Sequence, residues 1–84
     1  MKNRVIVSVY VPRLETSYDV FIPIGRKVKS VIRLCSKVIS EISGASFLPT
    51  DGKRVFNKKT GEEYDLEIII KDTDIRNGTT LILL

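Results

Sequence analysis

Apolar residues recur at every second position in two stretches within the first 24 residues of the chain. Valine occupies positions 5, 7, 9 and 11, and β-branched residues with a period of two are typical of a strand that buries one face. After a turn at residues 12–16, the alternation resumes at positions 18, 20, 22 and 24. The two stretches predict an antiparallel hairpin of strands 4–11 and 18–24. Because proline cannot donate a hydrogen bond to a ladder, Pro23 predicts that the second strand lies at a sheet edge or ends there.

The middle of the chain changes to the period of a helix. Apolar residues follow the i, i+3, i+4, i+7 spacing from residue 28 to residue 42, at Val28, Val31, Ile32, Cys35, Val38, Ile39 and Ile42. Gly25 marks a start and Ser43-Gly44 an end, because glycine accepts the left-handed conformation that terminates helices. Cys35 falls in the middle of the stripe. We therefore interpret it as a small buried hydrophobe and not as a reactive thiol.

The last third of the chain is predicted to form short extended pieces separated by turns. These are a loop at residues 45–52, a strand at 53–57, a turn at 58–61, an extended piece at 64–66, a turn at 77–78 and a final strand at 79–84. The order is therefore β-β-α-β-(β)-β. The apolar helix stripe is buried most simply when the helix lies across one face of a mixed sheet. This predicts one α+β domain spanning residues 1–84, with four or five strands.

Several segments resemble known proteins and make this expectation more specific. Residues 55–84, VFNKKTGEEYDLEIIIKDTDIRNGTTLILL, resemble the second half of ubiquitin-like proteins. That resemblance implies a β-grasp fold in which the C-terminal strand lies parallel to the first. YDVFIP at 18–23, KVKSVIRLC at 27–35 and IRNGTTLILL at 75–84 resemble the YukD/EsaB family. The resemblance covers nearly the whole chain.

The YukD/EsaB family consists of small ubiquitin-like proteins associated with type VII (WXG100, ESX-type) secretion in Gram-positive bacteria. Related domains form the cytoplasmic N-terminus of the membrane component EccD. The resemblance implies a non-catalytic adaptor, assembly or regulatory protein in the cytoplasm, held at the inner face of the membrane through partners. Those partners would be secretion components, such as a membrane pseudokinase, an EccD-type protein or an FtsK/SpoIIIE-type ATPase subunit. A regulatory or homodimer-forming ubiquitin-like domain outside secretion is the alternative.

Composition argues against most catalytic and metal chemistry. The 84 residues include one cysteine and no histidine, so we expect no internal disulfide and no zinc site. No nucleophile and base are paired by a known motif, and no glycine-rich phosphate loop is visible. Asp72 opens a stretch like a calcium loop, but Arg76 stands at a ligand position. We expect no enzyme activity, metal or cofactor, and we interpret Asp72 and Asp74 as turn and capping residues.

The sequence ends at Leu83-Leu84, without a Gly-Gly tail. Conjugated modifiers and sulfur carriers of this fold need an unhindered C-terminal glycine for adenylation. We therefore expect that the chain is not a conjugated modifier. A modifier precursor, or a shortened form of one, is the remaining option.

The outer face of the predicted sheet is the first candidate interface. If the valines of the first strand point inward, the residues between them point outward. The same parity applied to the other strands selects five outward apolar residues, Ile6, Tyr10, Phe21, Phe56 and Ile82. An apolar patch of this kind on a small domain is typical of a protein-binding surface.

A basic helix face is the second candidate surface. The net charge is +4, and cations cluster before and along the helix at Arg26, Lys29, Arg33 and Lys37. These residues would form a solvated ridge opposite the apolar stripe, which an acidic protein or anionic lipid headgroups could also contact. We expect no nucleic-acid binding, because stacking aromatics and a recognised motif are absent. Direct membrane insertion is not expected either.

Overall fold

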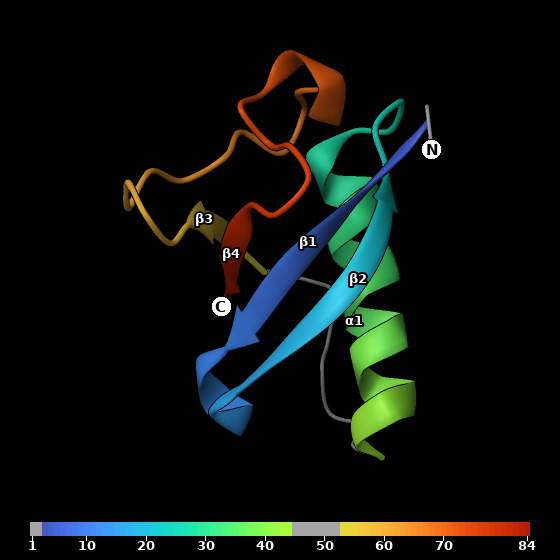
Figure 1. Ribbon diagram of the computed structural model, residues 1–84, viewed down its shortest axis with the longest axis vertical. Coiled ribbons are helices and arrows are strands. Elements are labelled where there is room, and N and C mark those ends of the chain that lie inside the picture. Colours follow the sequence, from blue (N-terminus) through green and yellow to red (C-terminus); the bar gives the residue numbers. More distant parts are fainter. Residues whose placement is uncertain (1–2, 45–52) are drawn as a thin grey trace.

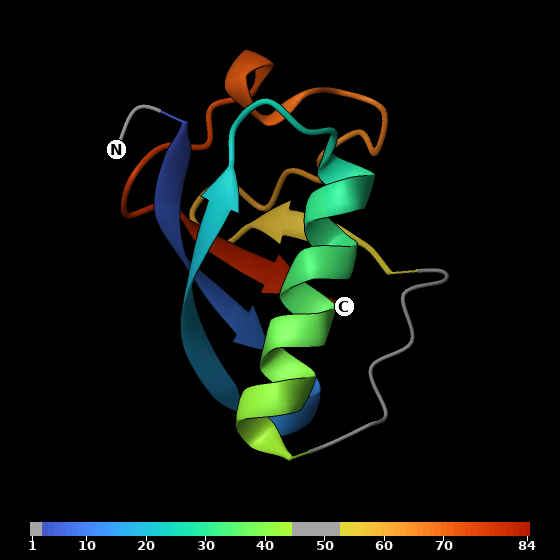
Figure 2. The same ribbon diagram turned by 90° about the vertical axis from the view of Figure 1, so that its right-hand side faces the viewer.

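One helix lies across one face of a four-stranded sheet (Figures 1 and 2). The computed structural model describes residues 3–44 and 53–84. Along the chain the elements are β1 (Arg4–Val11), a 3-10 helix (Pro12–Leu14), β2 (Thr16–Pro23), α1 (Val28–Ser43), β3 (Val55–Asn57), a second 3-10 helix (Ile70–Asp72) and β4 (Thr80–Leu83). This confirms the predicted α+β class and element order. The loop expected at 45–52 lies outside the described residues.

The strands lie side by side in the order β2-β1-β4-β3. β1 pairs with β2 in antiparallel orientation and with β4 in parallel, and β3 pairs with β4 in antiparallel orientation. β2 is therefore an edge strand that ends at Pro23, as its proline predicted. It begins at Thr16, earlier than the alternation suggested.

Alternation in the strands and the helix stripe together build the core. Val7, Val9 and Val11 are each only 1% exposed, and Leu81 and Leu83 enter the same cluster from β4. Burial raises the pKa of the Cys35 thiol to about 12, so the group is protonated near neutral pH, as expected of a buried small hydrophobe.

Two helix residues depart from the predicted stripe. Ile42 was expected to be buried, but it lies in the last turn of α1 and is 63% exposed. Ser36 was not expected inside, yet it is 1% exposed because it follows the buried Ile32 by four residues and shares its face. Its hydroxyl has no hydrogen-bond partner in the described part of the chain.

The two ends of α1 are determined differently. The C-cap is Gly44 at φ +72°, as predicted. The helix begins at Val28 and not near Gly25, and Lys27 makes no side-chain cap. Instead, the Val28 and Lys29 N–H groups donate to the carbonyls of Ile68 and Leu66 at 2.9 and 3.1 Å. The segment before the second 3-10 helix thus satisfies helix donors that would otherwise lack partners.

The extended piece predicted at 64–66 is not a strand. Glu63 forms only an isolated bridge with Phe56, and the Tyr64 N–H donates to the Val55 carbonyl at 3.0 Å. This stretch covers the outer edge of β3, and the sheet has four strands because the contact does not continue. The turn predicted at Asn77-Gly78 is confirmed, with Gly78 at φ +87°.

The turn around residues 70–75 is held by Thr73. Its hydroxyl donates to the Ile70 carbonyl at 2.6 Å and accepts from the Ile75 N–H at 3.1 Å. This role was predicted for Asp72 and Asp74, but an ionised carboxylate can only accept, whereas a hydroxyl can do both. None of the helices in residues 3–44 and 53–84 is long and apolar enough to cross a membrane.

Candidate protein-binding face

Three of the five predicted interface residues form one row across the outer face of the sheet. Tyr10 of β1 is paired with Ile82 of β4, and Ile82 is in turn paired with Phe56 of β3. All three are half-buried. We call these residues the Tyr10–Ile82–Phe56 row, because strand pairing makes them immediate neighbours.

The other two predicted residues lie apart from this row. Ile6 is paired with Phe21, which is 49% exposed. Between the two groups runs a polar line in which Ser8 is paired with both Asp19 and Thr80. Alternation alone indicated which residues face outward, but the register decides which of them touch. The five residues therefore form two groups and not one continuous patch.

Two cations lie over the aromatic rings of the row. The Lys58 Nζ is 5.3 Å from the centre of the Tyr10 ring, and the Arg54 guanidinium carbon is 5.1 Å from that of Phe56. Both distances are within the range of cation–π attraction. Residues 54 and 58 are each two positions from Phe56, so strand alternation places them on the same face of the sheet as Phe56. The sequence pattern could therefore have identified these two cations, although they were not predicted as site residues.

Arg54 and Lys58 differ in their charge partners. Arg54 donates two hydrogen bonds to the Glu63 carboxylate, at 2.6 and 2.9 Å, and this bonding lowers the pKa of that carboxyl. Lys58 forms no salt bridge with the carboxylates of residues 3–44 and 53–84. The row is therefore bordered by an ion pair at one end and by an uncompensated positive charge at the other.

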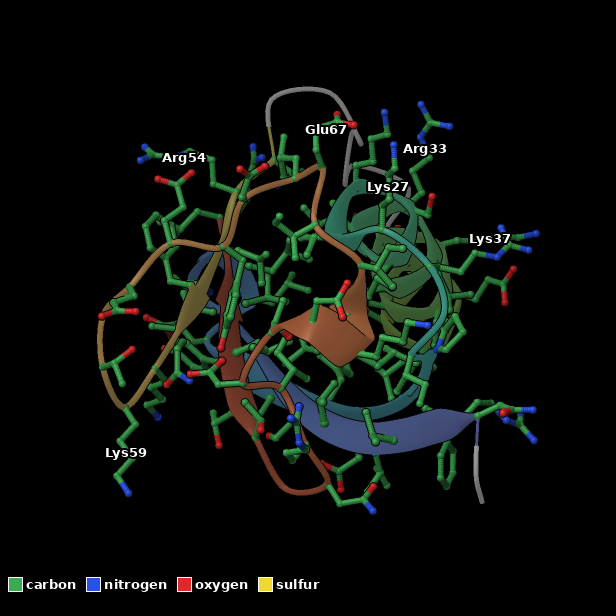
Figure 3. All side chains as sticks on the ribbon, turned by 90° about the horizontal axis from the view of Figure 1, so that it is seen from above. Lys27, Arg33, Lys37, Arg54, Lys59 and Glu67 are labelled. Carbon is green, nitrogen blue, oxygen red and sulfur yellow. The ribbon has the colours of Figure 1, made fainter. Side chains whose placement is uncertain are left out.

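The basic ridge is narrower than predicted. Lys29, together with Lys27, binds the two oxygens of Glu67, each at 3.1 Å, and these hydrogen bonds lower the pKa of the Glu67 carboxyl. Figure 3 shows Glu67 beside Lys27, with Lys37 pointing away from the sheet. Arg26, Arg33 and Lys37 are exposed, and none has an ion pair within the described ranges.

An acidic groove lies beyond β3. It has a volume of about 390 Å³ and is lined by Glu62, Glu63, Tyr64, Asp65, Ile68, Asp72, Thr73 and Asp74. The sequence shows these acids close together, but only the fold brings them around one tyrosine. Searched over the described residues, they include no group of three or more that could hold a metal ion.

Tyr64 anchors the wall of this acidic groove. Its hydroxyl donates to Asp74 Oδ1 at 2.6 Å and accepts from Asn57 Nδ2 at 2.9 Å. Burial, followed by the hydrogen bond to Asp74, raises the pKa of Tyr64 to about 12. The hydroxyl therefore remains a donor throughout the neutral range.

The Tyr64 pKa leads to a prediction about stability at high pH. The folded state retains the phenolic proton at a pH where the unfolded chain, with a pKa near 10, has released it. This contribution to stability is complete below about pH 10 and is lost as the pH rises from about 10 to about 12. We expect Tyr64→Phe to weaken this loss, measured by urea unfolding at a series of pH values. Spectrophotometric titration should lose phenolate signal near pH 12, and loss of signal near pH 10 instead would contradict the assignment.

Comparison with known proteins supports the fold assignment but assigns no family. No family model and no curated protein matches the sequence. Among solved structures, the ubiquitin-like domain of the type VII secretion protein EccD1 from Mycobacterium tuberculosis has a TM-score of 0.73 at 14% identity, covering 96% of this chain and 97% of that one. The chain has the ubiquitin-like β-grasp fold.

Two further structures show how widely this ubiquitin-like fold is used. A chain of the ESX-5 inner membrane complex has a TM-score of 0.76 at 16% identity, and the match covers 98% of this chain but 21% of that one. A chain from the toluene 4-monooxygenase HD complex has a TM-score of 0.74 at 14% identity, covering 95% of both chains. Because the identities are low and the contexts differ, these likenesses establish the ubiquitin-like fold alone.

Proposed function

We propose that this ubiquitin-like chain is a non-catalytic interaction module that binds another protein through the Tyr10–Ile82–Phe56 row. The observation that carries the proposal is the row itself, where two aromatic rings flank an aliphatic side chain on one face of a small domain. A few residues near the centre of an interface supply most of its binding energy, and tyrosine and arginine are enriched among them. The cations Arg54 and Lys58 suit a partner that presents carboxylates around an apolar centre.

We also propose that the partner belongs to a type VII secretion machine. Two features support this, namely the resemblance of three segments to YukD/EsaB proteins and the fold shared with the EccD1 domain. In this role the chain is an adaptor or assembly factor in the cytoplasm, docked on an EccD-type membrane protein or an FtsK/SpoIIIE-type ATPase. A regulatory or dimerisation domain outside secretion is the alternative.

Affinity capture from native lysate tests the proposed secretion role. Immobilised chain is expected to retain a type VII component, identified by mass spectrometry, and neighbouring reading frames are expected to include a WXG100-type substrate. Capture of only unrelated proteins, with no such neighbours, would contradict the secretion role. If the chain instead retains only copies of itself, the dimerisation alternative is correct.

Reversing the charge of the narrowed ridge tests whether it is a secondary contact. Arg33→Glu combined with Lys37→Glu should weaken capture several-fold and reduce its salt dependence, because salt screens attraction between exposed charges. Lys71→Glu combined with Lys59→Glu changes the net charge equally at exposed positions outside the ridge and is the matched control. If the ridge is only solvated, both double variants will bind like the unmodified chain.

A further inference from the structure

The register of the hairpin determines which backbone groups of β2 point away from β1. Asn3 and Ile24 are the next pair after Arg4 and Pro23 in the hairpin register. The Ile24 N–H donates to the Asn3 carbonyl at 3.0 Å, so this is a hydrogen-bonded pair. Hydrogen-bonded and non-hydrogen-bonded pairs alternate along an antiparallel ladder. Counting back along the strand, Phe21, Asp19 and Ser17 occupy non-hydrogen-bonded positions. Their N–H and C=O groups are therefore directed to the outer edge of the sheet.

Contacts on the other side of β1 agree with this alternation. It directs the backbone groups of Ile6 and Ser8 away from β2 and toward β4. The Ser8 N–H does donate to the Thr79 carbonyl at 3.0 Å, and the Ile6 carbonyl accepts from the Gly78 N–H at 2.9 Å. The assignment of the outward groups on β2 therefore rests on bonds at both sides of the hairpin.

The two edges of the sheet differ in how they are covered. The Asn57 N–H on β3 donates to the Glu62 carbonyl at 2.9 Å, so the chain itself occupies that edge. No hydrogen bond from residues 3–44 or 53–84 reaches the outward groups of Ser17, Asp19 or Phe21. An eight-residue edge strand with unpaired donors and acceptors is a template for an added strand.

An apolar flank of α1 lies next to this open edge. Lys29 binds Glu67, so its flank of the helix faces the segment before the second 3-10 helix. Leu34 and Val38 follow Lys29 by five and nine residues, which places them about 140° and 180° around the helix, on the flank away from Glu67. Both are half-buried, and Ile42 beyond them is 63% exposed. Figure 2 shows α1 alongside β2, so inward side chains of an added strand would meet this flank.

The charge on the outer edge of β2 indicates which kind of strand could pair with it. Asp19 is the one charged residue of β2 and is exposed. Two copies of the chain could pair antiparallel through their β2 edges, centred on Asp19, which is the middle one of the three outward positions. Asp19 of one copy would then face Asp19 of the other, and like charges directly opposite each other are destabilising. A lysine or arginine at that position would instead form a favourable cross-strand pair.

We propose that the outer edge of β2 binds an extended segment of a partner protein, which adds a strand to the sheet. The segment carries a lysine or arginine opposite Asp19, with an apolar residue on each side of it. Those apolar side chains turn inward onto the flank of Leu34 and Val38, because successive side chains of a strand point to opposite faces. The site is separate from the Tyr10–Ile82–Phe56 row, so the two proposals can fail independently.

A library of random heptapeptides displayed on phage tests this proposal on the full chain. Enriched peptides should share an apolar–basic–apolar core. Asp19→Pro removes the carboxylate together with an outward N–H, and it leaves the β1 ladder complete, at a position where edge strands accept proline. It should weaken peptide binding at least tenfold. Asp19→Ala keeps that N–H and loses only the charge pair, so it is the matched control, with an expected loss of about two- to fivefold.

Amide hydrogen exchange identifies the bonded groups. In the complex, exchange at the N–H groups of Ser17, Asp19 and Phe21 should slow, while that of Val20, already in the ladder, changes little.

If Asp19→Pro does not fold, as judged by its melting transition, Ser17→Pro tests another outward N–H. Enriched peptides that bind the proline variant normally, or that carry an acid at the centre, overturn the proposal. The proposal is also overturned if the library yields no peptide whose binding is weakened by Asp19→Pro. It is overturned as well if sedimentation shows that the chain is a dimer and that Asp19→Pro makes it a monomer.

Discussion

Replacing Ile82 with aspartate is expected to abolish partner capture while the domain remains folded. Ile82 lies between Tyr10 and Phe56, the positions where the proposed interface has its centre. A carboxylate there removes the aliphatic contact and must lose its water when a partner binds. Hot-spot residues, which cluster near the centre of an interface, each cost about 2 kcal/mol or more when truncated, which is about thirtyfold in affinity. Phe56→Asp should act similarly, because it also removes the ring beneath Arg54.

Phe21→Asp is the matched control for Ile82→Asp. Phe21 is also an outward apolar residue of the sheet, but it belongs to the separate pair with Ile6, so its replacement should leave affinity within about twofold. Thermal melting of each variant checks that the fold is intact, which is expected because these side chains lie on the face opposite the core. Capture that survives both Ile82→Asp and Phe56→Asp would refute the proposed interface.

Replacing Ile39 with alanine is expected to have the largest effect on stability. Ile39 is 0% exposed and packs in the core between α1 and the sheet. Truncating a buried isoleucine to alanine costs about 2–5 kcal/mol, out of a total that is typically about 5–15 kcal/mol for a domain. The melting temperature should fall by at least about 8 °C. Urea unfolding followed by circular dichroism measures the change in free energy.

Ile42→Ala is the control for this core substitution. The change of side chain is the same and lies in the same helix, but Ile42 is 63% exposed. The free energy of unfolding should therefore change by no more than about 0.5 kcal/mol. Equal losses at the two positions would show that the helix stripe is buried to its last turn, as the sequence pattern predicted.

Local patterns were sufficient to predict most of the fold. The valine alternation predicted β1 with its observed bounds, and Gly44 predicted the end of α1. The start of α1 was predicted too early, because its first donors are bonded by Ile68 and Leu66. The piece expected at 64–66 failed as a strand because strand pairing depends on a partner that is distant in sequence.

The candidate site was only partly predictable. Parity along each strand selected Tyr10, Phe56 and Ile82 as outward residues, and it could have added Arg54 and Lys58. It could not show that Ile6 and Phe21 lie apart from them, because that separation comes from the register between strands. Nor could it show that Glu67 would neutralise part of the basic ridge, since the ion pairs join residues about 40 positions apart.

The sequence by itself determined which residues face inward and outward, since periods of two and 3.6 follow from the geometry of single strands and helices. Only the tertiary structure decided which outward residues are neighbours. Strand order and register brought Tyr10, Ile82 and Phe56 into one row. Among residues 3–44 and 53–84, they also left the outer edge of β2 without hydrogen-bond partners, while the chain covered the β3 edge. The physical reason is that both outcomes depend on hydrogen bonds between residues far apart in the chain, which no local pattern specifies.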